Sequence, residues 1–402
     1  MANAQSNLSV TKYIVEVTPG TTPAAALTIL PVKTSDMVAQ VNTVTSQEIR
    51  SDRATADLVR ASANSTGTIG YELSYTDYAN FFESALGTAS TAHAGTASGN
   101  RTVLVSMSAA TISAAAADNS LNDSATGFVT AGITANSWIV FRGFTGGNIA
   151  NNNKPAKVVS VAAGKIVLSY ITLVDDAAGE TVTIKGQSIT NAANKKTFSL
   201  EKAYTDLSNV FSYHKGMIVN TMTLNAASGA IVEGSFGFMG RDSAYTGTTI
   251  GTGADVTPAA TPIMSATANI GTIYIDGTAL TTTYLKSINL STTANARQLD
   301  AIGNLYPIDV NLGSLGVTAA ISAYFNDATQ INRFLNGTSF SLVWSFQDSA
   351  TNWIVVDLPY CKYNTGTVSA STLNADTMSD LSVTALLSPS ENVMIRMAFL
   401  PA

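Results

Sequence analysis

Charge is scarce in this chain. Lysine, arginine, aspartate and glutamate together account for 48 of its 402 residues, or 12%, which is about half the ~25% of an ordinary globular domain. A chain of this length has a large surface, and so few charges would leave much of that surface poorly hydrated if all of it were exposed to water. The sequence therefore predicts self-assembly, in which copies of the chain cover much of one another.

Cysteine and histidine are nearly absent. Cys361 is the single cysteine, so no internal disulfide can form, and His93 and His214 are the two histidines. These residues are too few for a zinc or haem site, and we expect no metal and no cofactor. Both histidines are expected to be ordinary surface residues, His93 in a linker and His214 near a turn.

Other signatures are missing as well. No apolar run approaches the ~20 residues of a membrane-spanning helix, and no basic patch precedes an apolar core at the N-terminus, so we expect neither a membrane segment nor a signal peptide. The net charge is −6, and Lys195-Lys196 is the nearest approach to a basic cluster. Both observations argue against nucleic-acid binding. The motifs of serine hydrolases, P-loop proteins and zinc proteases are absent, so the sequence predicts no enzyme.

What the chain does contain is a series of short runs in which apolar and polar residues alternate. Examples are Thr68–Ser74, Phe198–Glu201 and Val232–Phe238. Alternation of this kind is typical of β-strands whose sheet is packed on one side only. The sequence therefore predicts a mainly β fold.

An internal repeat is visible at a fixed offset. Residues Thr68–Thr88 align without a gap with Thr318–Thr338, 250 positions later. Each copy predicts a strand that runs into a short helix, which begins near the N-cap pair Thr76-Asp77 or Asn326-Asp327 and ends at Gly87 or Gly337.

A second repeated block has a different offset. The segment that starts at Thr197 matches the one that starts at Ser339, 142 positions later, so the first copy carries 108 additional residues. We expect a tandem duplication with a domain inserted in the first copy only. The expected boundaries are residues 1–88 with 197–245 for the first copy, 89–196 for the insert, 246–262 for a linker and 263–402 for the second copy.

The insert itself predicts a small all-β domain that faces outward. Its aromatic residues Trp138, Phe141 and Phe144 are more simply core residues than a binding patch. The expected strands are Val103–Met107, Gly127–Ile133, Trp138–Arg142, Lys157–Val161, Lys165–Tyr170 and Thr181–Lys185.

Three stretches of the first copy carry a resemblance to a known family. They are Ser46–Arg53 with Ala56–Leu58, then Gly70–Tyr75 followed by Phe81–Gly87, and finally Phe198–Lys202 with Gly234–Gly240. In order and spacing they are similar to the tail tube proteins of phages with long, non-contractile tails (siphophages), which also have an insert at this place. The resemblance covers about residues 10–90 and 195–245, and the second copy matches only through the internal repeat.

The resemblance implies two tandem β-sandwich or barrel units, each with a short helix, whose hairpins join neighbouring subunits into a closed β-barrel ring. Stacked rings would form the tube through which genomic DNA is ejected from the virion. Because that family builds sixfold rings of such units, two units per chain imply homotrimeric, pseudo-hexameric rings. Six chains per ring, with the second copy on the outside, is the alternative.

The implied partners are further copies of the chain and other tail proteins, namely the terminator, the tape measure and the tail tip. Viral DNA would pass without specific binding, and no membrane would be involved. The implied location is the virion tail, after synthesis and assembly in the host cytoplasm. An extracellular β-scaffold, such as an adhesin or a surface-layer protein, would share the low charge and the Thr, Ala and Gly richness, and is the alternative function.

A conduit for DNA must not hold DNA, because a basic lining would bind its phosphates. Glu72, Glu201 and Glu233 lie on the polar faces of expected strands, and we expect them to face the lumen and repel the duplex. The alternative is an outer, solvated face. In the second copy the positions of Glu72 and Glu201 hold Ser322 and Val343, which carry no charge.

Two further features predict contacts between subunits. Open sheet edges recruit other chains, so strands near Met217–Leu224 and Ala230–Met239 are expected to cross subunit boundaries, with a self-contained sandwich as the alternative. The densest charge predicts a loop that sets ring stacking or subunit register, with a plain solvated loop as the alternative. Its residues are Glu48, Arg50, Asp52, Arg53, Asp57 and Arg60.

Overall fold

The fold is mainly β, as the sequence predicts. The computed structural model describes residues 3–88, 105–370 and 372–402. The linker expected after Thr88, His93 and the first residues of the strand expected at Val103 lie outside the described residues. In the described part of the chain no helix is both long and apolar enough to cross a bilayer.

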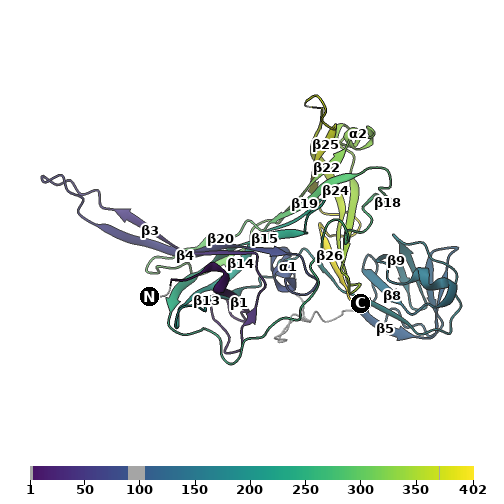
Figure 1. The fold of residues 1–402 in the computed structure, drawn as a ribbon, viewed down its shortest axis with the longest axis horizontal. Coiled ribbons are helices and arrows are strands. Elements are labelled where there is room, and N and C mark those ends of the chain that lie inside the picture. Colours follow the sequence, from purple (N-terminus) through teal and green to yellow (C-terminus); the bar gives the residue numbers. More distant parts are fainter. Residues whose placement is uncertain (1–2, 89–104, 371) are drawn as a thin grey trace.

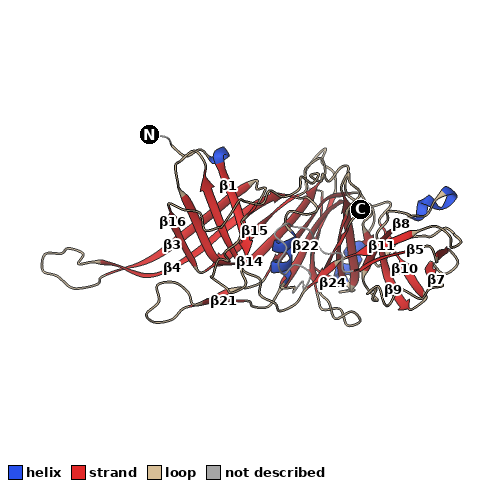
Figure 2. Ribbon diagram, turned by 90° about the horizontal axis from the view of Figure 1, so that it is seen from below, coloured by secondary structure: helices blue, strands red, loops and turns tan. Residues whose placement is uncertain are grey.

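The first half of the chain, residues 3–88 with 197–246, forms two layers of antiparallel strands with a short helix between them (Figures 1 and 2). A 3-10 helix, η1, spans Ser6–Leu8. The strands and the helix are β1 (Ser9–Val15), β2 (Thr28–Ile29), β3 (Thr34–Thr45), β4 (Leu58–Glu72), α1 (Ala79–Leu86), β13 (Phe198–Tyr204), β14 (Phe211–Ala227), β15 (Glu233–Gly240) and β16 (Asp242–Thr246).

The second half, residues 263–402, repeats the main elements in the same order. Helix α2 begins 250 positions after α1, and β24 has the bounds of β14 shifted by 142 positions. The elements are β17 (Tyr274–Ile275), β18 (Thr278–Ala279), β19 (Leu285–Thr293), β20 (Arg297–Leu299), β21 (Asp309–Asn311), β22 (Gly316–Tyr324), α2 (Thr329–Leu335), β23 (Phe340–Gln347), β24 (Trp353–Ser369), β25 (Met378–Ala385) and β26 (Arg396–Leu400).

The strand pairing is also the same in the two halves. In the first, β14 pairs with β13, β15 and β16, while β4 lies between β15 and β3. In the second, β24 pairs with β23, β25 and β26, while β22 lies between β25 and β19. The two halves therefore share one topology.

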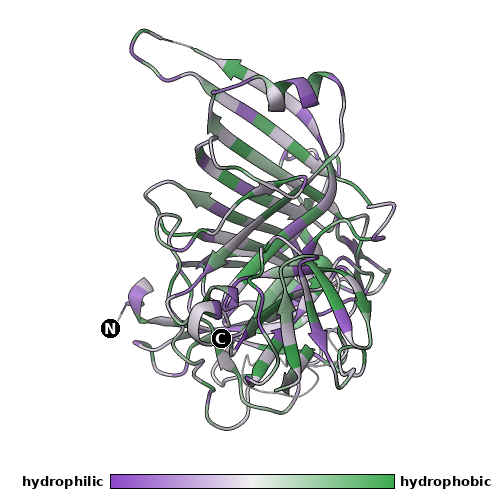
Figure 3. Cartoon of the chain, turned by 90° about the vertical axis from the view of Figure 1, so that its right-hand side faces the viewer, coloured by the Kyte–Doolittle hydropathy of each residue, from purple (hydrophilic) through white to green (hydrophobic). Residues whose placement is uncertain are grey.

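One apolar core runs through both halves. Along the strands hydropathy alternates from residue to residue (Figure 3), and the apolar side chains turn inward onto the helices. The core includes Tyr71, Phe81 and Phe236 from the first half and Trp344 and Phe399 from the second, all at most 1% exposed. Burial of this continuous apolar surface is the main force that holds the halves together.

Both helices begin one residue later than the caps that the sequence predicts. The N-cap residues are Tyr78 and Ala328, and neither makes a side-chain cap hydrogen bond. Asp327 still accepts from the Thr329 N–H at 2.7 Å. Gly87 ends α1 with a φ of 67°, a left-handed conformation that a glycine adopts without strain.

Residues 105–186 form a separate seven-stranded sheet in the order β5-β11-β8-β9-β10-β7-β6. It encloses a core of its own, in which Phe141 and Phe144 are buried. The strands are β5 (Val105–Ala109), β6 (Ile112–Ala115), β7 (Ser120–Asp123), β8 (Trp138–Arg142), β9 (Ala156–Ala162), β10 (Lys165–Ser169) and β11 (Val182–Gly186), with a 3-10 helix, η3, at Gly146–Asn151. We call residues 105–186 the insert.

One expected strand of the insert is wrong. Residues Gly127–Ile133 form turns, because the Asp123 carboxylate accepts the backbone N–H groups of Ala125 and Gly127 at 3.0 and 2.7 Å. Gly132 then takes a φ of 82°, which is incompatible with an extended strand. The strands β6 and β7, which the sequence analysis missed, occupy the place of the missing strand in the sheet.

Candidate assembly surfaces

Eight strands form one continuous antiparallel sheet that spans both halves. Their order is β3-β4-β15-β14-β19-β22-β25-β24, and we call this the inner sheet. Each half contributes four neighbouring strands. The two halves meet where Thr221–Ala227 of β14 pair with Ser287–Thr293 of β19 over seven residue pairs.

The inner sheet has an open edge at each end. Among the described strands, β3 forms a ladder only with β4 at one end, and residues Tyr363–Ser369 of β24 form a ladder only with β25 at the other. The β3–β4 hairpin projects far from the body of the molecule, at the left of Figure 1. Open edges of this kind present unpaired N–H and C=O groups and recruit another strand.

These are not the strands that the sequence analysis expected at subunit boundaries. The segment Ala230–Met239 contains β15, which has β14 on one side and β4 on the other, so that prediction is wrong. The segment Met217–Leu224 belongs to β14, whose outer edge pairs with β19 of the same chain. The second half thus occupies the edge that a single unit would leave open.

One face of the inner sheet is polar. Directly paired residues lie on the same face of a sheet, and Glu72 is paired with Glu233. The matching position in the second half holds Asp380, opposite Ser322. The charged residues at register-paired positions of this face are Asp36, Glu72, Glu233, Asp380 and Lys362.

Glu233 has a basic neighbour. Lys33 donates to its carboxylate, and this hydrogen bond and ion pair raise the pKa of the lysine. Both side chains are nearly half exposed, so the pair is screened by solvent and contributes little to stability.

Glu201 does not share the polar face. It is 1% exposed and lies in β13, in the outer layer of the first half. Its carboxylate accepts from the Ile250 N–H at 2.7 Å and from Thr249 Oγ1 at 2.9 Å, and Lys12 Nζ lies 3.4 Å away. A buried and fully engaged carboxylate cannot line a channel, so we keep only Glu72 and Glu233 of the three candidates.

The charged segment forms the tip of the β3–β4 hairpin. Residues 46–57 connect the two strands and are exposed apart from Ser46, which is half-buried. Arg50 Nη2 lies 2.8 Å from Asp52 Oδ2, and this bond lowers the pKa of the aspartate. The remaining charged residues of the set, Glu48, Arg53, Asp57 and Arg60, are exposed and have no ion pair among the described residues.

His214 is not a surface residue. It is 3% exposed and lies in β14 at a point where that strand pairs with β13 and β16. Its Nδ1 is 2.7 Å from Ser65 Oγ, and burial lowers the pKa of the imidazole to about 4.

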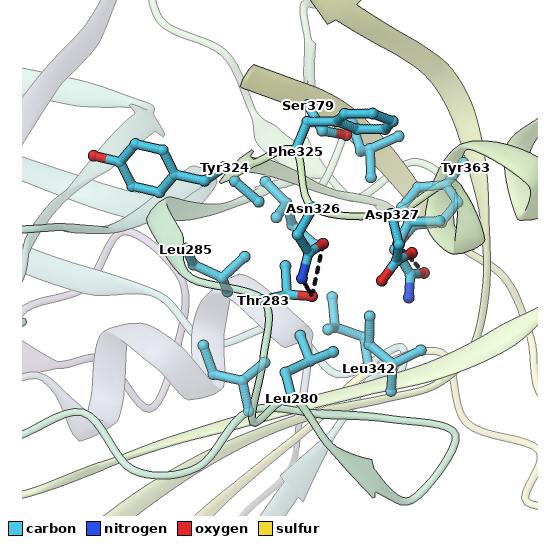
Figure 4. A pocket seen from close by; sticks show the side chains of 16 residues that line it. Leu280, Thr283, Leu285, Tyr324, Phe325, Asn326, Asp327, Leu342, Tyr363 and Ser379 are labelled. Atoms are coloured by element: carbon cyan, nitrogen blue, oxygen red, sulfur yellow. Dashed lines mark hydrogen bonds between the residues drawn. The ribbon is translucent and has the colours of Figure 1, made fainter. Parts of the chain in front are cut away.

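The two helices differ in burial although their positions correspond. Every residue of α1 is buried, whereas α2 has no buried residue. Beside α2 lies a hollow lined largely by apolar side chains, with Tyr324 and Phe325 at its rim and Asn326 bonded to Thr283 (Figure 4). Matching core positions hold Tyr71 in the first half and only Ile321 in the second, which leaves this space less filled.

A family model described as phage tail tube protein matches residues 6–385. The chain belongs to the phage tail tube protein family. No curated protein matches it. The protein is therefore a structural component of a phage virion tail, where it assembles into a tube with other tail proteins, and nothing favours an extracellular scaffold. Proteins of this structural family are generally not enzymes.

The tail tube protein also has a buried charge cluster that the sequence analysis missed. Asp357 Oδ2 accepts from Trp138 Nε1 at 2.9 Å and from Arg396 Nη1 at 2.9 Å, with Lys157 Nζ 3.0 Å away. Glu391 pairs with both Lys157 and Arg396 at 2.8 Å. Trp138 and Lys157 belong to the insert and the other three to the second half, so this cluster anchors the insert.

The insert of the tail tube protein therefore leaves the first half but docks on the second. Trp138 and Val140 pack against Val343, Val355 and Leu400 on the outer surface of the β23–β24–β26 layer. The exit strand β12 (Ser188–Thr190) then pairs with β26. Lys157 lies 200 or more positions from Asp357 and Arg396 in the sequence, so no local sequence signal predicts such a contact.

Proposed function

We propose that this tail tube protein forms homotrimeric rings with pseudo-sixfold symmetry, which stack into the tube of a long, non-contractile tail. The observation that carries the proposal is the inner sheet, to which each half contributes four equivalent strands. Three copies joined edge to edge would close this sheet into a barrel without a free edge. Because both halves continue one sheet, six chains with the second half outside is the weaker alternative.

The polar face of the inner sheet is the proposed lumen. The opposite face carries the apolar core and the outer strands, and the insert packs beyond those outer strands, which favours an outward position for the insert. Glu233 and Asp380 occupy matching positions in the two halves, so three chains would present six carboxylates at one level of the barrel. Glu72 and Asp36 would add further negative charge near them.

Negative charge on the lumen suits transit of genomic DNA during ejection. The duplex carries a dense phosphate charge, and carboxylates repel it over about one Debye length, ~8 Å at physiological salt. The DNA would then pass without specific binding.

The charged tip of the β3–β4 hairpin is the proposed contact between subunits or between rings. It projects beyond the body of the molecule, and its charges of both signs suit a register contact. The terminator, tape measure and tail tip are the proposed partners that begin, measure and end the tube, assembled in the host cytoplasm. Membership of the tail tube protein family supports these proposed partners.

Electron microscopy of the purified chain, with averaging along the tube axis, tests the proposal. We expect hollow tubes or rings with threefold symmetry and six similar density lobes per ring, and native mass spectrometry of rings should give three chains. Rings of six chains would contradict the trimer, and sheets or solid fibres would contradict the tube.

A further inference from the structure

The junction between the two halves shows how one unit receives the next. The edge of β14 pairs with β19, and Phe399 of the second half lies against the first half, with its ring centroid 6.4 Å from Tyr75 and 6.0 Å from Phe82. Helix α1 contributes Phe82 and is buried along its whole length. We call β14, α1 and Tyr75 the receiving face of the first half.

The second half repeats the receiving face, and there the face is bare. Residues Tyr363–Ser369 of β24 correspond to the paired edge of β14 but have β25 as their single partner strand in the described part of the chain. Phe325, which corresponds to Tyr75, is 38% exposed, and Leu335 on α2 is 70% exposed. The matching residue on α1, Ala85, is 3% exposed.

The first half repeats the opposite, entering face, which is also bare. The edge of β3 corresponds to that of β19. Tyr245 corresponds to Phe399, because Tyr245 pairs with Ser212 as Phe399 pairs with Ile354, 142 positions later. Tyr245 is 70% exposed, whereas Phe399 is fully buried. Each chain therefore has one receiving face and one entering face that pair with each other at the junction between its halves. It has a second face of each kind that is bare.

We infer that a second copy of this chain docks with its β3 edge on β24 and its Tyr245 against Phe325 and α2, in the register of the internal junction. This inference rests on the proposed ring. We transfer from the internal junction to the junction between copies only those contacts that repeated elements make. The pairing of β12 with β26 is left out, because β12 has no counterpart among the described strands of the second half.

The register follows from residue pairs inside the chain. Thr223 is paired with Ser291, and Thr365 corresponds to Thr223. Ser291 is opposite Thr318, and Asp36 is opposite Thr68, its equivalent in the repeat. Thr365 of one copy is therefore placed opposite Asp36 of the next.

Two neighbouring pairs extend this register. They are Gly366 with Ser35 and Thr367 with Thr34. In the single chain Lys202 Nζ donates to the Ser35 carbonyl at 3.2 Å, and lysine beside an open edge is a common guard against unwanted strand pairing.

Paired cysteines test the register in the full chain. Directly opposed residues of antiparallel strands have Cα atoms about 4.5–5.5 Å apart, within the range of a disulfide. We expect the double variant Asp36→Cys with Thr365→Cys to form covalently closed trimers under mild oxidation. Cys361 is buried, and burial raises the pKa of its thiol, so it stays out of the reaction.

Three controls accompany this variant. Each single variant should form no trimer, and Asp36→Cys with Ser369→Cys, four residues out of register, should link far less. Thr223→Cys with Ser291→Cys should form the corresponding bond within one chain. Rings that form without the Asp36–Thr365 link, or that link equally well out of register, would overturn the inference and leave the ring itself standing.

Aromatic variants give a second measurement. We expect Tyr245→Ala and Phe325→Ala each to lower the fraction of chains in rings at least tenfold at a fixed concentration, measured by sedimentation velocity. Ile149→Ala, on the insert and 64% exposed, is the matched control and should assemble normally. Normal assembly of both aromatic variants would overturn the docking surface. Absence of rings from the unmodified chain at every concentration would overturn the proposed function as well.

Discussion

The environment of His214 predicts that the stability of the fold depends on pH. Its pKa is lowered from 6.5 to about 4 by burial, so the folded chain holds it neutral while the unfolded chain protonates it below pH 6.5. The stability it contributes is therefore fully present above pH 6.5 and is lost as pH falls from there through about 4. A shift of this size corresponds to ~3 kcal/mol.

We expect His214→Asn to remove this part of the pH dependence. The amide oxygen of asparagine can accept the Ser65 hydroxyl bond but takes up no proton in this range. Urea unfolding of the monomeric chain at pH 7.5 and pH 4.5 measures the difference. If the variant and the unmodified chain lose the same free energy of unfolding between those pH values, the buried neutral histidine is not its source.

For single residues, the sequence predicted which side chains of a strand face the apolar core. It did not predict which distant segments contact the polar side chains of the same strand. Ile69, Tyr71 and Phe236 were placed on the apolar side by their spacing alone, and all are fully buried. Glu201 has the same alternation as Glu72, yet Lys12 and residues 249–250 cover it. Only segments distant in the sequence distinguish a solvated strand face from one that another segment covers.

Among the elements, the contact between the insert and the second half depends on Asp357. Its side chain is fully buried and faces Lys157, Arg396 and Trp138. Asp357→Asn leaves Lys157 and Arg396 close together with Glu391 as the one carboxylate still paired with both, and removal of one partner of a buried ion pair costs about 3–5 kcal/mol. We expect a lower melting temperature and new protease cleavage near residues 186–196, where the insert would separate from β26.

Asp118→Asn is the matched control for this variant. Asp118 pairs with Lys165 on the surface of the same insert, where both side chains are nearly half exposed, and exposed pairs contribute little. A control that melts as early as Asp357→Asn, or an Asp357→Asn chain that resists protease, would argue against the cluster as the anchor.

Elements that recur in the sequence were the easiest to predict. The offset of 250 positions relates the starts of α1 and α2, and the offset of 142 relates β14 to β24 at both ends. When the two copies of the repeat show the same pattern of polar and apolar residues, that pattern is a more reliable sign of a strand or helix than either copy alone. The insert has no second copy, and there one expected strand proved to be a series of turns while β6 and β7 were missed.

For the molecule as a whole, the sequence predicted a duplication but not how its copies are joined. A count of residues locates an insert, yet it says nothing of the sheet on which the insert docks. The continuity of the inner sheet depends on β14 pairing with β19. In both paired segments Thr, Ser or Asn alternates with apolar residues, a pattern that indicates strands but does not say which strand each one pairs with. Such strands gain their register from the apolar residues on the other face.

The last prediction concerns the charge of the proposed lumen. Glu72 and Asp380 lie on the polar face, one in each half, and Glu72→Lys with Asp380→Lys reverses charge there without touching the core. Because cationic side chains bind phosphates in a salt-dependent manner, we expect assembled tubes of this variant to retain short duplex DNA in co-sedimentation at ~50 mM salt and to release it at higher salt. The unmodified tubes should retain none.

Asp118→Lys with Asp175→Lys is the control, because it adds the same charge on the insert, outside the proposed channel. It separates binding in the lumen from binding to the outer wall: DNA held by the control variant would be open to nuclease, whereas DNA in the lumen would be protected. Tubes of the Glu72 and Asp380 variant that retain no DNA, or retain it unprotected, would place the polar face elsewhere than on the channel.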